Sequence, residues 1–324
     1  MKWLHISDIH YNPKADGRYT MRSRNRLPKF IKENELKADH LFVTGDYRHA
    51  YKQRDQDEDK VAADVVDYII SIADAASIPR ENIHLIPGNH DLKRIDKKER
   101  PADFKKLEKI RQSYLEDPEV FDDDDMKFLD APFSFFSKVC KRLRSKVPQI
   151  DIPWLDEDIM PSIIGRPYDE FSLICINTCL FCHSDDARKK LVIDIGLLYR
   201  VAADLEEKNP GKPIVFLAHH GFSELDNEVE KQLEDVFGDI KEETIYLCGD
   251  AHDLWIRSIN HTIEITTGCL VDGKNVKTLI SMGECTNNSF QSIKGFNCER
   301  GYWASYPLFD QEIKKHLENR KAII

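Results

Sequence analysis

Five short polar clusters in the chain could bind divalent cations, and each directly follows an apolar run. The clusters are Asp8 and His10, Gly45 and Asp46, Asn89 with His90 and Asp91, His219 with His220, and Asp250 with His252. The exposed end of a buried strand lies at the rim of an α/β sheet, where side chains from distant parts of the chain converge. Carboxylates, imidazoles and amides are common ligands of divalent cations. The order of the clusters therefore predicts a two-metal hydrolytic site.

The residue types suggest which side chains bind the cations and which act on substrate. Asp8 and His10 are two residues apart at a predicted strand exit, so both can turn toward one point. Asp46 follows a glycine that allows a tight turn, and its two carboxylate oxygens can bridge two cations. Asn89 offers a neutral oxygen, while His90 beside it is left to act on substrate. Further imidazoles come from His219 and His252.

Strands and helices must alternate to place these clusters. Apolar runs that end at a polar residue predict strands near Lys2–Ser7, His40–Thr44, Asn82–Ile86, Phe171–Asn177, Pro213–Ala218 and Thr244–Cys248. Apolar residues at helical spacing predict helices over Arg22–Leu36, Asp59–Ala76, Ile195–Lys208 and Glu224–Phe237. Three later segments resemble a strand meander, at Trp255–Ile259, His261–Thr266 and Val276–Met282. We expect an α/β fold in which the meander forms a second sheet packed against the first.

Two segments depart from this alternation. Residues 92–167 contain helical patterns at Pro101–Leu115 and Pro132–Arg144, and we interpret them as an insertion that caps the site or serves as a plain helical spacer. Residues 289–324 are rich in aromatic side chains and end in a charged, helix-like stretch. This extension either packs back on a domain of residues 1–288 or docks a protein partner.

Composition excludes some classes of function. Hydrophobic residues make up 41% and charged residues 32% of the 324, and no apolar run approaches the roughly 20 residues that span a bilayer. The formal net charge of −10 argues against a surface built to neutralise long nucleic-acid backbones. Local basic patches stay open, at Arg18, Arg22, Arg24, Arg26 and Lys29, and at Lys93, Arg94, Lys97, Lys98 and Arg100. The strand-like start lacks a secretion signal, so we expect a cytoplasmic protein.

The eight cysteines fit that expectation. Several lie in apolar, strand-like segments, where reduced and buried thiols are common. Cys179 and Cys182 form a CxxC pair, but a zinc ribbon needs a second pair, and a thioredoxin-like motif should open a helix. We interpret the pair as structural.

The joint order of the clusters resembles the calcineurin-like metallophosphoesterase superfamily. Its pattern runs DxH, GD, GNHD, a His in an HH or HS pair, then GHxH. Here the motifs are Asp8-Ile9-His10, Gly45-Asp46, Gly88-Asn89-His90-Asp91, His219-His220 and Gly249-Asp250-Ala251-His252. The resemblance covers residues 1 to 285. It implies a sandwich of four layers, with two mixed β-sheets flanked by helices, and here a helical insertion.

The resemblance also implies roles for individual residues. One cation would be held by Asp8, His10, Asp46 and His252, and the other by Asp46, Asn89, His219 and position 250. His90 would be the catalytic imidazole that stabilises or protonates the leaving oxygen, with Asp91 orienting it. Arg48 could contact a phosphate oxygen as a planar fork, or else pair with an acid of the insertion.

Position 250 departs from the family pattern, which usually has histidine there. Three carboxylates against two divalent cations would leave a net charge of about +1, instead of about +2 with histidine. Oxygen-rich sites favour harder ions, so we expect two manganese ions, with magnesium, iron or zinc as alternatives. Alternatively, Asp250 caps a turn and the second cation binds weakly or not at all.

We therefore expect a metal-dependent phosphoesterase that hydrolyses a phosphodiester or phosphomonoester through a metal-bridging hydroxide. The opening MKWLHISDIHYN looks more like the cyclic-nucleotide phosphodiesterase and DNA-repair nuclease branches than the protein phosphatases, whose GDxVDRG is absent. A nuclease acting on DNA or RNA ends is one alternative, and it would need a basic groove. A catalytically weak, metal-stabilised module that binds a protein partner is another. The substrate, whether nucleotide, nucleic acid or another phosphate ester, carries no readable motif.

Overall fold

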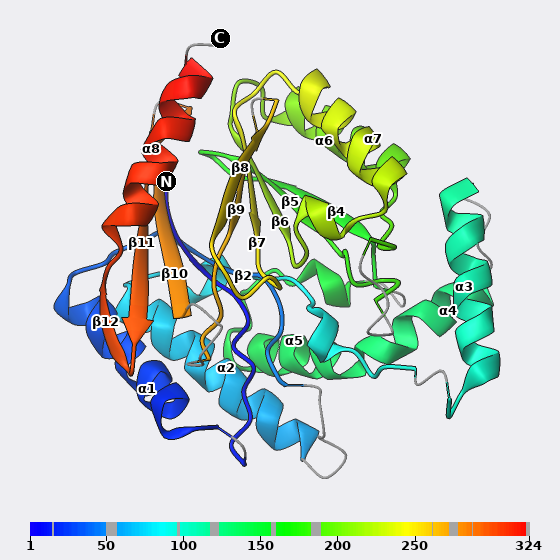
Figure 1. Ribbon diagram of the computed structural model, residues 1–324, viewed down its shortest axis with the longest axis horizontal. Coiled ribbons are helices and arrows are strands. Elements are labelled where there is room, and N and C mark those ends of the chain that lie inside the picture. Colours follow the sequence, from blue (N-terminus) through cyan, green and yellow to red (C-terminus); the bar gives the residue numbers. More distant parts are fainter. Residues whose placement is uncertain are drawn as a thin grey trace.

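The apolar runs fold as the strands of two mixed β-sheets that lie against each other (Figure 1). A computed structural model describes residues 1–14, 16–49, 57–95, 98–116, 123–156, 160–182, 189–260, 262–271, 278–286 and 288–321. The first sheet has the order β12-β11-β10-β1-β2-β3, with β1 Lys2–Ile6, β2 His40–Val43, β3 Ile83–Leu85, β10 Thr278–Thr286, β11 Ser289–Glu299 and β12 Tyr302–Ser305. The second has the order β4-β5-β6-β7-β9-β8, with β4 Ile163–Pro167, β5 Ser172–Ile176, β6 Ile214–Ala218, β7 Thr244–Cys248, β8 Trp255–Ile259 and β9 Thr262–Thr266.

Parallel pairing brings the polar clusters to one rim. Strands β1, β2 and β3 are parallel to one another, as are β5, β6, β7 and β9. The carboxyl ends of parallel strands meet at the same edge of a sheet. Asp8, Asp46, His219 and Asp250 each follow such an end by one to three residues. The core of both sheets is apolar, with all five residues of β6 buried.

Helices cover the outer sides, which completes the four-layer sandwich and confirms the predicted fold class. The helices are α1 Arg18–Glu33, α2 Glu58–Ala75, α3 Pro101–Glu116, α4 Asp123–Asp130, α5 Ser134–Lys146, α6 Ile195–Lys208, α7 Asn227–Asp239 and α8 Pro307–Lys321. In Figure 1, α1 and α2 lie below the first sheet, and α6 and α7 lie over the second. Helix α2 begins where the Asp57 carboxylate accepts the amides of Asp59 and Lys60. No helix in the described ranges is long and apolar enough to cross a membrane.

The three segments expected to form a meander are strands, but they do not belong to one sheet. Strands β8 and β9 extend the sheet that holds β7, whereas β10 joins the other sheet and pairs antiparallel with β1. Alternation along a strand shows that one of its faces is buried, but it does not show which sheet receives it. His261, Val276 and Lys97 lie outside the described residues, as do 117–122, 157–159 and 322–324 of the predicted insertion and extension.

The C-terminal extension continues the first sheet. Strand β11 begins at Ser289 and pairs with β10, so the division predicted at residue 288 falls inside this hairpin. Helix α8 then packs on β11 with Phe309 and Ile313 buried, and the Asp310 side chain accepts the amide of Gly295 at 2.9 Å. A docking role for residues 289–324 stays a prediction.

The predicted insertion contributes to both the helical layer and the second sheet. Its last five residues form β4, the edge strand beside β5. Helix α5 packs on α2, and the Trp154 indole donates to the carbonyl of Leu85 at 2.6 Å. Helices α3 and α4 stand apart at the right of Figure 1, and the Tyr114 ring of α3 lies 5.1 Å from that of Phe181. A capping role stays a prediction.

Candidate metal centre

The loops that carry the predicted ligands hold a rare backbone conformation. Five of the predicted ligands have positive φ, namely Asp8 at 53°, His10 at 45°, Asp46 at 56°, Asp250 at 62° and His252 at 52°. Such residues cost about 1–3 kcal/mol each and persist where their surroundings enforce them. Backbone bonds do so here, because Asp8 N–H donates to Gly45 O at 3.1 Å and His10 N–H to Asp46 O at 2.8 Å. Five of the eleven non-glycine residues with positive φ in the described ranges therefore lie where the clusters converge.

Gly45 makes this close approach possible. Its φ is 93°, and a Cβ at this position would lie 2.6 Å from the Cα of Gly88. Only glycine fits this contact without displacing the neighbouring loop. The loops after β2 and β3 are therefore in direct backbone contact.

Four of the predicted ligands form a first group. Asp8, His10, Asp46 and His252 each present a ligand atom, and all four atoms lie within 4.8 Å of one another. His252 Nε2 is 3.1 Å from Asp8 Oδ1, and His10 Nε2 is 3.6 Å from Asp46 Oδ2. This is the set that the family resemblance assigned to one cation.

A second group lies on the other side of Asp46. His219 Nε2 is 3.3 Å from Asp46 Oδ1 and 3.6 Å from Asp250 Oδ1. The Asn89 amide donates to Asp250 Oδ1 at 2.8 Å. The His219 Nδ1–H donates to the carbonyl of Thr44 at 2.7 Å, which leaves Nε2 to face the group. Asp250 thus lies with the second group.

Unpaired buried atoms test whether these residues fit a pair of cations. Buried side-chain atoms without a hydrogen-bond partner in the described part of the chain include Asp8 Oδ1, Asp46 Oδ2, Asn89 Oδ1 and His219 Nε2. An unpaired buried polar atom costs about 1–3 kcal/mol, and more when charged. All four are ligand atoms that divalent cations bind, so the residues fit the group.

Charge in the centre is balanced between carboxylates and imidazoles. Burial works against the ionised form of Asp8, yet the nearby His10 and His252 imidazoles hold its pKa well below the usual range. Burial also works against the His252 cation, but Asp8 raises its pKa to about 9. Asp46 differs, because burial and the neighbouring carboxylates raise its pKa well above the usual value. Ionised Asp46 therefore needs added positive charge.

His90 lies at the edge of the first group. Its backbone N–H donates to Asp46 Oδ1 at 2.8 Å, and its Nε2 is 3.9 Å from Asp46 Oδ2. Its ring centroid is 4.8 Å from that of His10. Burial, and then the neighbouring cationic groups, lower the pKa of His90 to about 2. A neutral imidazole here stabilises charge by hydrogen bonding rather than as a cation.

Asp91 contacts backbone amides. Its carboxylate accepts from Asp46, Tyr47 and Gly88 at 3.0, 2.9 and 2.8 Å, and more weakly from Arg48 at 3.4 Å. These bonds hold the loops after β2 and β3 together. Asp91 therefore positions Asp46 at least as directly as it could orient His90.

Arg48 is buried beside the centre and paired with an acid outside the insertion. Its guanidinium donates to Glu58 at 2.7 Å and lies 4.1 Å from the centroid of the Phe135 ring. The expected acid of the insertion is wrong, because Glu58 begins α2. Contact with a phosphate stays a prediction.

Comparison with known proteins identifies the family. The family model described as calcineurin-like phosphoesterase matches residues 1–254. The chain belongs to this family. A curated relative, the uncharacterized metallophosphoesterase-like protein YydB of Bacillus subtilis (strain 168), is 24% identical over 326 residues, covering 94% of this chain and 61% of the relative. The chain thus spans about three fifths of that relative's length.

Solved structures of low identity share the fold. A dimetal phosphatase from Danio rerio is 11% identical with a TM-score of 0.54, covering 94% of this chain and 98% of that one. A putative 5'-nucleotidase from Staphylococcus aureus, in complex with alpha-ketoglutarate, is 13% identical with a TM-score of 0.50, covering 98% and 58%. At these identities the two structures show a shared fold.

Two histidines near the centre were not assigned a role from the sequence. His220 was placed in neither predicted set of ligands, but it joins His219 and Asp250 in a possible metal-binding group, with Nε2 4.0 Å from Asp250 Oδ1. The ring of His49 lies 5.3 Å from that of His90 and 5.4 Å from that of His10. Its position three residues after Asp46 was the available signal, because a short loop keeps such a residue near the rim.

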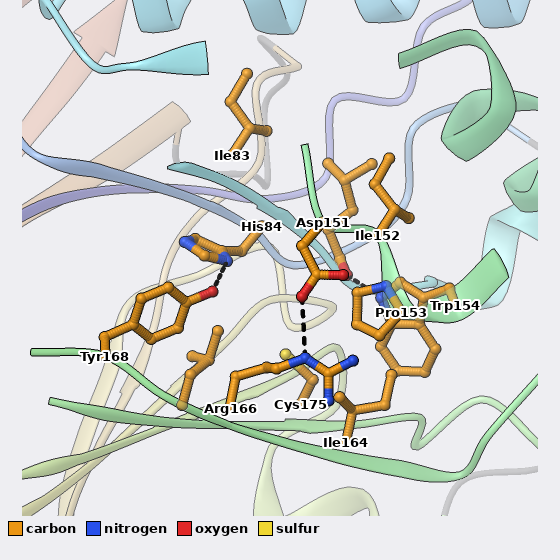
Figure 2. A pocket seen from close by; sticks show the side chains of 12 residues that line it. Ile83, His84, Asp151, Ile152, Pro153, Trp154, Ile164, Arg166, Tyr168 and Cys175 are labelled. Atoms are coloured by element: carbon orange, nitrogen blue, oxygen red, sulfur yellow. Dashed lines mark hydrogen bonds and ion pairs between the residues drawn. The ribbon is translucent and has the colours of Figure 1, made fainter. Parts of the chain in front are cut away.

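A separate pocket opens at the edge formed by β3 and β4 (Figure 2). None of the predicted site residues lines it. Figure 2 shows Tyr168 pointing its hydroxyl at His84, 3.5 Å from Nδ1, and Arg166 bonded to Asp151 at 3.0 Å. This pocket is therefore separate from the two groups of predicted metal ligands.

Proposed function

We propose that this calcineurin-like phosphoesterase is a binuclear phosphodiesterase that uses two divalent cations, with manganese preferred. The observation that carries the proposal is the convergence of buried, unpaired ligand atoms from Asp8, Asp46, Asn89 and His219. Family membership supplies the ester chemistry. The opening motif supports the diester over the monoester.

The residues divide into two ligand sets. Asp8, His10, Asp46 and His252 would hold one cation, and Asp46, Asn89, His219 and Asp250 would hold the other. When bound, two such cations supply a hydroxide nucleophile near neutral pH and neutralise the phosphoryl oxygens. Asp46 joins the sets, because its Oδ1 faces His219 and its Oδ2 faces His10.

The chain's own residues then orient and stabilise the reacting ester. His90 is held against Asp46 by its backbone bond, so its ring stays beside the first group. From there a neutral imidazole can donate a hydrogen bond to the leaving oxygen as charge develops on it. Asp91 fixes the two loops that carry Asp46 and His90. This arrangement favours charge stabilisation without movement of the backbone.

Turnover of bis-p-nitrophenyl phosphate tests the proposal. With manganese added we expect hydrolysis by wild type, a loss of about 10²–10⁴-fold in His90→Ala, and no turnover in Asp46→Ala. His316→Ala on α8 is the matched control, because this histidine contacts Ser258 away from the centre. If wild type is as inactive as Asp46→Ala with every divalent cation tried, the proposal fails. The metal-stabilised binding module would then be favoured.

The metal preference has its own test in Asp250→His. This change restores the residue that the family usually has and removes one carboxylate from the second group. We expect the ratio of manganese-supported to zinc-supported turnover to fall, because imidazole suits zinc better than carboxylate does. An unchanged ratio would contradict the argument from Asp250.

A further inference from the structure

One face of α1 carries a row of arginines. Arg18, Arg22 and Arg26 are spaced four residues apart, so they lie on the same side of the helix over about 12 Å. Within the ranges that the structure describes, none of the three forms an ion pair with a carboxylate. In a chain of net charge −10, this row is a local excess of positive charge.

An exposed tyrosine lies beside the row. Tyr302 on β12 is 61% exposed, and the guanidinium carbons of Arg26 and Arg22 lie 4.5 and 5.6 Å from its ring centroid. The Arg26 guanidinium also donates to the carbonyl of Gly301 at 3.1 Å, so the ring and the cations are held together. Figure 1 shows α1 and β12 side by side, with β12 at the edge of the first sheet. We call Arg18, Arg22, Arg26 and Tyr302 the α1–β12 face.

The helix that carries this face is bonded to a metal-binding loop. On the opposite side of α1, Arg24 donates to the carbonyls of Ile9 and His10 at 2.6 and 2.8 Å. A polymer lying along α1 would therefore be attached to the element that supports His10. Two hydrogen bonds therefore connect the helix that carries the face to the loop that carries His10.

The chemistry of the face fits a single strand of nucleic acid. Regularly spaced guanidiniums neutralise successive phosphates, and an exposed aromatic ring offers a surface on which a base stacks. A membrane surface is less favourable, because insertion of the Tyr302 ring would also remove the two flanking guanidiniums from water. A planar base can instead stack on the ring while both cations stay at the phosphates.

We propose that the α1–β12 face binds single-stranded nucleic acid and holds the strand whose phosphodiester is the substrate. The second half of this statement rests on the function proposed above. Binding itself does not, because the face contains none of the residues assigned to the metal-binding groups.

Fluorescence anisotropy of a fluorescein-labelled oligothymidine of 20 nucleotides, in EDTA and low salt, tests the binding. We expect Arg22→Glu/Arg26→Glu to weaken binding at least about tenfold and to reduce the slope of log K against log salt by about 1.4, for two lost phosphate contacts. The matched control is Lys105→Glu/Lys109→Glu, which reverses two exposed lysines one turn apart on α3. It should bind like wild type.

Three further variants separate stacking from charge and from folding. Tyr302→Ala should weaken binding about tenfold, whereas Tyr302→Phe keeps the ring and should bind within about twofold of wild type. Arg18→Glu should also weaken binding, and its exposed side chain makes loss of folding an implausible cause. Thermal unfolding of each variant checks that the fold is intact.

The outcomes distinguish the two proposals. Wild type that binds the oligonucleotide but does not hydrolyse bis-p-nitrophenyl phosphate would overturn the proposed function and leave the binding face standing. Wild type that hydrolyses the diester but does not bind the oligonucleotide would overturn the face. So would an Arg22→Glu/Arg26→Glu variant that binds as tightly as the α3 control. If the Arg22→Glu/Arg26→Glu variant loses binding to phosphatidylserine vesicles while its binding to the oligonucleotide is unchanged, the face would be assigned to a membrane instead.

Discussion

Replacing Asp46 with asparagine should stabilise the metal-free protein. The Asp46 carboxylate is fully buried, its Oδ2 lacks a hydrogen-bond partner among the described residues, and burial raises its pKa well above the usual value. When folding raises the pKa of an acidic side chain, the protein loses stability as the pH rises and that side chain ionises. Ionised Asp46 therefore opposes folding at pH 7.5. Asparagine keeps Oδ1 for the His90 amide and removes the charge. We expect a gain of about 1–3 kcal/mol in EDTA.

Added divalent cations should make wild type more stable than Asp46→Asn. Wild type gains about 2.7 kcal/mol when the free metal concentration is 100 times its Kd, whereas Asp46→Asn lacks the charged oxygen shared by both groups and should gain little. Asp46→Asn should therefore be the more stable protein in EDTA and the less stable one in manganese. Urea unfolding at pH 7.5, followed by tryptophan fluorescence, measures both free energies of unfolding.

The control for this experiment is Asp91→Asn. The Asp91 carboxylate accepts backbone amides through both of its oxygens, so removing one oxygen should destabilise the protein in both solutions. If Asp46→Asn is less stable than wild type in EDTA, the buried carboxylate does not destabilise the metal-free protein. The inference of a metal centre from unpaired atoms would then be refuted.

Three further predictions concern the fold around the site. Burial lowers the pKa of His40 to about 4, so the stability that neutral His40 contributes is complete above pH 6.5 and is lost as the pH falls toward 4. When the pH is lowered from 7.5 to 5.0, His40→Phe should therefore lose about 2 kcal/mol less stability than wild type, as measured by urea unfolding. Gly249→Ala should abolish the manganese-induced rise in melting temperature, because the added Cβ would lie 1.9 Å from the hydroxyl of Ser7, beside Asp8. Gly17→Ala is the control: its Cβ would meet nothing within 4 Å, so this variant should behave like wild type. Phe309→Ala should cost about 3–5 kcal/mol in thermal unfolding if α8 is integral to the first sheet, and Leu308→Ala, at a side chain that is 65% exposed, should cost almost nothing.

The rim of the site could be predicted from the sequence because its geometry follows from strand direction. Asp8, Asp46, His219 and Asp250 each come just after a buried run, and parallel strands bring such positions to one edge. The family motif added a prediction of which side chains would share a cation. Neither source of information needed the loops to be known in detail.

The partners of the buried charges could not be predicted in the same way. Arg48 pairs with Glu58 and Asp91 accepts backbone amides, and both arrangements depend on how the loops fold back on the strands. Sequence spacing gives no measure of such contacts. His49 was overlooked for the same reason, since only the folded loop shows that its ring faces His90.

The long hairpin of the first sheet was missed for a different reason. Its register shifts between Glu284 and Cys285, so the alternation of apolar and polar residues changes phase within the strand. Strand β11 also carries polar residues among its buried aromatic ones, and both of these features hide a period of two residues. Aromatic content alone indicated burial but not a strand.

The carboxylate of Asp91 gives the centre an evolutionary constraint. One side chain satisfies amides from the turn after β2 and from the turn after β3, so neither turn can change its path without leaving the other with a buried, unpaired N–H. Insertions or deletions in one motif would thus require a matching change in the other. The GD and GNHD segments, 42 residues apart, should be inherited as a single unit even in relatives whose insertion, tail and residue at position 250 have all diverged.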